Sequence, residues 1–116
     1  MTTAKSAAPV TVFAAFRLAE GRTEADLLAA SQRFQEDFVS QQPGVLRREL
    51  IRKADGGYID IVQFRSAADV DDVLAKEKES AACNALFSIL EGPDDGSDGV
   101  TLHDSLATYV SKAAAQ

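Results

Sequence analysis

The chain has 116 residues, of which 46% are hydrophobic and 26% are charged, and its formal net charge is −6. This length suits one domain with a single hydrophobic core, and the composition is ordinary for a globular protein. No run of about 18 apolar residues could cross a membrane. An acidic chain is also poorly suited to nucleic acid or anionic lipid, so we expect neither as a partner.

The ends of the chain look unlike the middle. The first nine residues, "MTTAKSAAP", lack the apolar core of a secretory signal. We predict a disordered arm over residues 1–8, one domain over 9–110 and a frayed tail over 111–116. The single cysteine, Cys83, cannot form an internal disulfide, so we expect a reducing, cytoplasmic location.

The first half of the domain predicts a strand followed by a helix. Apolar residues alternate along 9–18, which favours a strand covered on both faces. Thr23 and Asp26 then form a capping pattern. The helix that follows is expected to run to about Gln41, before Pro43, and to bury one stripe consisting of Leu27, Ser31, Phe34 and Phe38.

The second half predicts a hairpin, further helices and a final strand. "VLRRELIRK" and "YIDIVQF" flank "ADGG", which is a hairpin signal. Ser66 with Asp69 repeats the capping pattern, and "CNALFSIL" indicates a third, short helix. The acidic loop "EGPDDGSDG" lacks the spacing of a calcium loop, so we expect no metal. Residues 100–110 are predicted as the last strand.

The resulting order, β-α-β-β-α-(α)-β, predicts an α+β, ferredoxin-like domain whose four-stranded antiparallel sheet carries its helices on one face. The other face is expected to be apolar as well. Alternation puts Leu46 and Leu50 on one side of the second strand, and Val45 and Ile51 on the other. Because a large exposed apolar face favours association, we predict a homodimer that packs two sheets together.

Three segments carry a family resemblance, namely "VTVFAAFRLAEGR", "QQPGVLRREL" and "YIDIVQFRSAADVDDVLA". Over residues 9–110 the chain resembles the dimeric α/β-barrel superfamily, and most of all its antibiotic biosynthesis monooxygenase-like domains. The best-matching pieces are Pro43-Gly44 and Phe64-Arg65-Ser66. Phe64 stands where a tryptophan commonly ends the third strand, and Val62 stands where an acidic residue is often found.

The resemblance implies a pocket between sheet and helices for a small aromatic or polycyclic molecule. It also implies oxidation by molecular oxygen without a metal or flavin, so no cofactor is expected. Haem-degrading relatives use a helix histidine that has no counterpart after Ser66, so haem degradation is not expected.

His103, the only histidine, is the predicted catalytic base. Histidine side chains titrate near neutral pH and can accept a phenolic proton. The alternative is a histidine that serves only the sheet or the dimer interface. Asp104 points to the opposite face of the strand, so a partner carboxylate is expected from elsewhere, with Asp60 as the candidate.

Arg17 is the second predicted catalytic residue, since a guanidinium can hold a carboxylate or enolate; a surface ion pair is its alternative role. The predicted substrate-binding residues are aromatic: Phe13, Tyr58, Phe64 and Tyr109. For Arg47, Arg48 and Arg52 the expectation is ion pairs with Glu49 or Asp60. Cys83 is expected to fill core volume.

The predicted function is therefore a small-molecule-binding dimer, with cofactor-independent monooxygenation of an aromatic or polyketide-like substrate as its activity. A cyclase or isomerase would need the same base and anion stabiliser. A non-catalytic ligand-binding or assembly module of the same fold is the alternative from another class.

Overall fold

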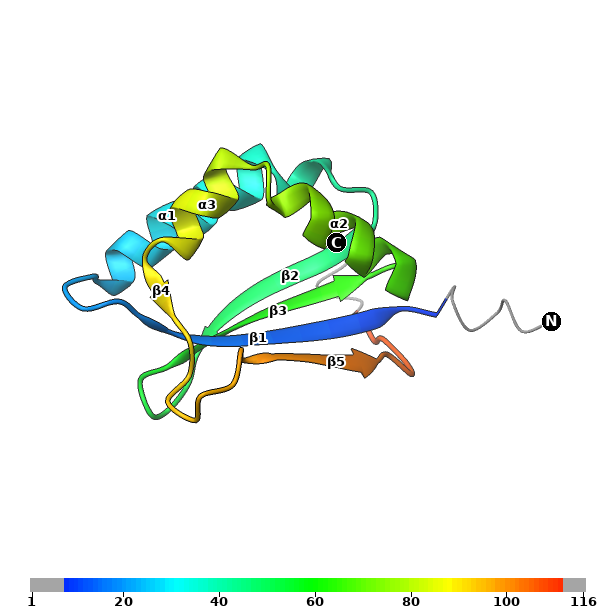
Figure 1. Cartoon of the computed structure of the whole chain (residues 1–116). Coiled ribbons are helices and arrows are strands. Elements are labelled where there is room, and N and C mark those ends of the chain that lie inside the picture. Colours follow the sequence, from blue (N-terminus) through cyan, green and yellow to red (C-terminus); the bar gives the residue numbers. More distant parts are fainter. Residues whose placement is uncertain (1–7, 112–116) are drawn as a thin grey trace.

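The computed structural model describes residues 8–111. The predicted arm and tail lie largely outside this range. The chain forms two layers, with every helix on the same side of an antiparallel sheet (Figure 1). Its elements, in order, are β1 (Val10–Leu18), α1 (Glu24–Asp37), the 3-10 helix η2 (Val39–Gln41), β2 (Val45–Arg52), β3 (Tyr58–Phe64), α2 (Ala67–Glu77), α3 (Ala81–Phe87), β4 (Leu90–Glu91) and β5 (Val100–Asp104).

The sheet confirms the ferredoxin-like prediction. β1 lies in its centre, with β3 and then β2 along one edge. Along its other edge, β5 pairs with the first half of β1, and the short β4 pairs with its last two residues. The two-residue β4 is an addition to the four predicted strands.

Both predicted helix starts are confirmed. Thr23 and Asp26 form a reciprocal capping box at the start of α1, and the Ser66 side chain accepts from the N–H of Asp69 at the start of α2. A cap of this kind satisfies N–H groups that the helix itself leaves unpaired. The predicted stripe of α1, Leu27, Ser31, Phe34 and Phe38, is buried against the sheet.

The core lies between the helices and one face of the sheet. Its strand residues include Val10, Phe16, Tyr58 and Phe64, which meet Val70 and Val73 of α2 and Cys83 and Leu86 of α3. Period-two alternation leaves the next residue of each strand on the opposite face. That second face, which we call the open face, carries Phe13, Ile51, Ile59 and Ile61 and is covered by no helix.

Two element boundaries and the face of one residue differ from the sequence predictions. The last strand ends at Asp104 and not at residue 110, because Asp104 already pairs with Val10, the first residue of β1. The first helix ends at Asp37, and the 3-10 turn η2 replaces its last predicted turn. In β2, an irregularity between Val45 and Arg47 turns Val45 onto the helix-covered face, although strict alternation predicts the open face.

Candidate functional site

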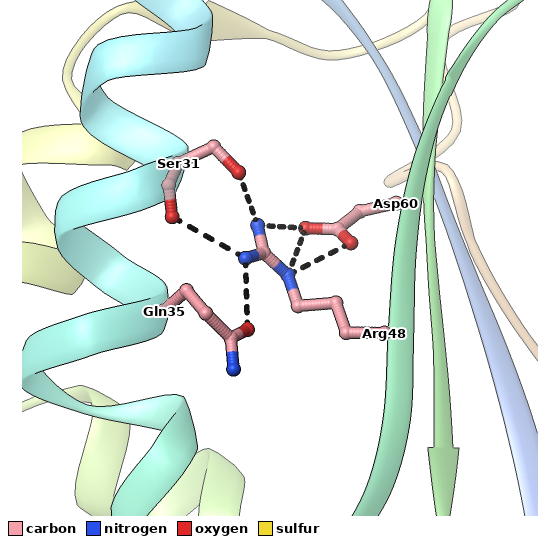
Figure 2. Close-up of polar contacts among 4 residues, drawn as sticks. All are labelled: Ser31, Gln35, Arg48 and Asp60. Carbon is pink, nitrogen blue, oxygen red and sulfur yellow. Dashed lines mark hydrogen bonds and ion pairs between the residues drawn. The ribbon is translucent and has the colours of Figure 1, made fainter. Parts of the chain in front are cut away.

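A buried ion pair lies on the helix-covered face, between the edge strand β2 and its neighbour β3. Arg48 of β2 and Asp60 of β3 both point away from the sheet toward α1 (Figure 2). The Nε of Arg48 donates to both carboxylate oxygens of Asp60 at 3.0 and 3.1 Å, and Nη2 donates to Oδ2 at 2.8 Å. The two side chains are only 8% and 14% exposed, so neither charge is screened by bulk water.

The remaining donors of Arg48 are held by α1. Nη2 donates to the hydroxyl of Ser31 at 2.8 Å, and Nη1 donates to the Ser31 carbonyl and to Oε1 of Gln35 at 3.3 and 3.4 Å. The guanidinium also lies 5.0 Å from the ring centre of Phe34. The pair is therefore fixed in one geometry, as a buried charge must be.

An apolar cavity of about 280 Å³ opens between α2 and α3. Leu74 and Phe87 give it two large apolar walls, and Cys83 and Asn84 line it from α3. Glu77, the last residue of α2, brings a half-buried carboxyl group to the same cavity. Lys78 adds an amino group to the lining. A cavity that combines apolar walls with a few ionisable groups has the composition of a small-molecule site.

The environment of Glu77 shifts its acidity. Burial and, to a smaller extent, the nearby negative charge of Asp60 raise the pKa of Glu77 to about 7, while the positive charge of Arg48 partly opposes them. Glu77 is therefore a mixture of carboxylate and carboxylic acid at neutral pH. Strongly shifted groups in cavities are typical of acid–base sites.

Cys83 is inert in the same surroundings. Its side chain is 1% exposed, and burial together with the charge of Glu77 raises the pKa of the thiol to about 12. The thiol is thus protonated at physiological pH. This agrees with the expected role of a small core residue and excludes a thiolate nucleophile.

The predicted base, His103, lies on the open face. It pairs with Thr11 across the β1–β5 ladder, its Nε2 shares a 2.9 Å hydrogen bond with the Thr101 hydroxyl, and its ring centre is 4.9 Å from that of Phe13. His103, Thr11 and Phe13 line a shallow cavity of about 380 Å³ together with Tyr109. Three of the predicted site residues, Phe13, His103 and Tyr109, are therefore brought together.

The other predicted residues lie elsewhere. Arg17 forms an exposed 3.1 Å ion pair with Asp94 near the far end of β1. Tyr58 and Phe64 point into the core on the helix-covered face, where the Tyr58 hydroxyl donates to Glu24 at 3.0 Å. The suggested His103–Asp60 partnership is wrong, because Asp60 faces the helices and is engaged by Arg48.

Sequence reasoning anticipated the Arg48–Asp60 pair but missed Glu77. Arg47 pairs with Glu49 as predicted, while Arg52 pairs instead with Glu24 of α1. Glu77 had a signal that could have found it. It follows Val70, Val73 and Leu74 at helical spacing, so it is an acidic residue on the apolar stripe of α2.

The fold is shared with solved structures of antibiotic biosynthesis monooxygenases. SnoaB, a cofactor-independent oxygenase from Streptomyces nogalater, matches 88% of this chain and 97% of its own, with a TM-score of 0.68 and 21% identity. A protein from Caulobacter crescentus named as a candidate antibiotic biosynthesis monooxygenase matches 90% of this chain and 95% of its own, with a TM-score of 0.68 and 15% identity. The fold is theirs.

A third structure, Rv0793 from Mycobacterium tuberculosis, covers 88% of this chain and 99% of its own, at 20% identity and a TM-score of 0.61. No protein-family model and no curated protein matches the sequence. Identities this low establish a common fold and leave the activity to be argued from the site. No helix within residues 8–111 combines the length and apolarity that a membrane span requires.

Proposed function

We propose that the protein is a homodimeric, cofactor-independent monooxygenase that takes an aromatic or polyketide-like molecule into the cavity between α2 and α3. The observation that carries the proposal is the cavity itself. It has apolar walls, an ionisable carboxyl group at its edge and a buried ion pair nearby, in a fold that SnoaB shares.

The source of the electrons that reduce O₂ determines which substrates this reaction can use. Without a metal or flavin, the substrate itself must reduce oxygen, so it must be convertible to an electron-rich anion. A hydroxylated aromatic ketone with an activated CH₂ group meets this need after it loses a proton to a base. The balanced reaction converts CH₂ and O₂ into C=O and water, with all four electrons supplied by the substrate.

The protein's part is to bind the substrate and to remove a proton from it. Leu74 and Phe87 offer apolar surface to a flat aromatic ligand. Asp60 and Arg48 act on Glu77 in opposite directions, because the negative charge of Asp60 raises the pKa of Glu77 and the positive charge of Arg48 lowers it.

The proposed dimer joins two open faces. Phe13, 37% exposed, and the isoleucines of β2 and β3 supply its apolar centre. The segment after β5 adds Leu106, Tyr109 and Val110, which are 95%, 91% and 71% exposed. His103 and its cavity would then be enclosed between the two sheets, so its structural role is to fill the interface.

A non-catalytic ligand-binding module is the second candidate. The observation in its favour concerns the N–H donors of Arg48. All of them are hydrogen-bonded to Asp60, Ser31 or Gln35, so none is available to a ligand. Oxygen uptake separates the two candidates, because a binding module would bind the same molecules without consuming oxygen.

A thermal-shift screen with phenols, quinols and polycyclic ketones tests the proposal on three proteins. These are the wild type, Leu74→Trp, which fills the cavity, and Ala75→Trp, which adds the same side chain to an exposed position of α2. We expect stabilisation of the wild type and Ala75→Trp only, followed by oxygen uptake with the bound compound. Equal stabilisation of all three proteins would place the ligand outside this cavity and overturn the proposal.

A further inference from the structure

We infer that Glu77 is the general base of the proposed reaction: its carboxylate accepts the O–H proton of a phenol bound against Leu74 and Phe87. The inference rests on the proposed function and names the catalytic group and the substrate class. It replaces the sequence-based choice of His103, which lies on the opposite face of the sheet.

The position of Glu77 suits a base. It is half-buried at the last residue of α2 and lines the cavity beside both apolar walls. Within residues 8–111, no ion pair or hydrogen bond engages its carboxylate. By contrast, the other carboxylate of this interior, that of Asp60, is fully committed to Arg48. Glu77 is therefore the acceptor that remains available to a ligand.

The charges around Glu77 match this role. Arg48 of β2 and Asp60 of β3 approach from the sheet, the Cys83 thiol from α3, and Lys78 from the residue after α2. Arg48 and Asp60 act on the pKa of Glu77 in opposite directions, and the thiol is neutral. With a pKa of about 7, Glu77 is a stronger base than an ordinary carboxylate and still largely ionised at slightly alkaline pH.

The proton transfer is balanced without any further reactant. The phenol O–H bond breaks, its electron pair stays on the phenolate oxygen, and a Glu77 Oε takes the proton to become a neutral carboxyl group. Because Glu77 becomes neutral, the negative charge moves onto the ligand, from which the oxidation by O₂ then proceeds. Glu77 returns its proton to solvent before the next turnover.

Two probes test the base without requiring turnover: 1-naphthol, which carries a phenolic hydroxyl, and naphthalene, which lacks it. We expect the wild type to bind 1-naphthol at least tenfold more weakly at pH 5 than at pH 8, because the neutral carboxyl group of protonated Glu77 is a much weaker hydrogen-bond acceptor than the carboxylate. Naphthalene affinity should stay unchanged over the same range. In Glu77→Gln the pH dependence should vanish for both probes, whereas Glu79→Gln, an exposed neighbour, should behave as the wild type.

Kinetics supply the second readout once a substrate consumes oxygen. The kcat/KM of the wild type should rise with pH and level off above about 7, and Glu77→Gln should lose at least a hundredfold in kcat at a melting temperature no lower than that of the wild type. If Glu77→Gln kept the pH dependence of 1-naphthol binding, or kept the kcat of the wild type, Glu77 would not be the base. The proposal that the ligand binds in this cavity would still stand. Failure of the wild type to bind either probe would overturn the cavity, and the proposed function with it.

Discussion

Replacing Asp60 by asparagine should destabilise the protein strongly. The substitution keeps the shape of the side chain but removes the charge that balances Arg48, whose side chain is 8% exposed. It also turns an NH₂ group toward a guanidinium that needs acceptors, so at least one of the three contacts of 2.8–3.1 Å is lost. Leaving one member of a buried pair uncompensated typically costs about 3–5 kcal/mol.

The double variant Arg48→Met/Asp60→Leu tests the reason for that loss. It removes both charges together, so it should be less destabilised than the sum of Arg48→Met and Asp60→Leu by about 2 kcal/mol or more. Urea unfolding followed by circular dichroism gives the free energy of unfolding for each protein. Because a domain of this size has roughly 5–15 kcal/mol in total, a single variant is expected to remain measurably folded.

Additivity would refute the reasoning. If the double variant lost the sum of the two single losses to within about 0.5 kcal/mol, Arg48 and Asp60 would not depend on each other, and the buried pair would not organise this interior. A loss of under 1 kcal/mol for Asp60→Asn would lead to the same conclusion, since that is the range of an exposed ion pair.

Three further predictions concern other groups. The folded state raises the pKa of Glu77 from 4.5 to about 7, so the free energy of unfolding of the wild type should fall as pH rises across this interval, by about 3 kcal/mol at most. Urea unfolding at pH 5 and pH 8 measures this difference, and Glu77→Gln should remove it. Iodoacetamide should modify Cys83 at pH 8 at least a hundredfold more slowly in the folded protein than in urea, because the thiol is buried and protonated; equal rates would contradict this. Ile61→Glu on the open face should convert the proposed dimer to a monomer in size-exclusion chromatography, and Leu28→Glu, at a 56% exposed position of α1, should not; a dimer that survives Ile61→Glu uses another surface.

Much of the fold could be predicted because its signals are local. The capping pattern at Thr23 and the hairpin around "ADGG" each depend on a few neighbouring residues, and both are confirmed. The end of the last strand could not be predicted in this way. It is set by Val10, where the partner strand begins more than ninety positions earlier in the chain.

The candidate site was harder to predict because it depends on packing. Alternation correctly separated His103 from Asp104. It offered Glu49 or Asp60 as partners for the arginines of the second strand, and the structure pairs Arg48 with Asp60. It carried no information on how α2 and α3 meet, and that junction creates the cavity. Glu77 sits in "AKEKES", a run that is typical of a solvated helix end, and only the tertiary structure buries it.

The most direct test of the central claim is oxygen-isotope labelling of the product. The wild type is incubated under ¹⁸O₂ with the phenolic or polycyclic ketone substrate that the screen identifies, without added metal, flavin or nicotinamide. Mass spectrometry then measures the mass of the product. The account predicts one ¹⁸O atom in each product molecule, with product formation lost in Glu77→Gln and retained in Glu79→Gln. Product that carries only oxygen from water, or no product beyond the protein-free rate, would contradict it.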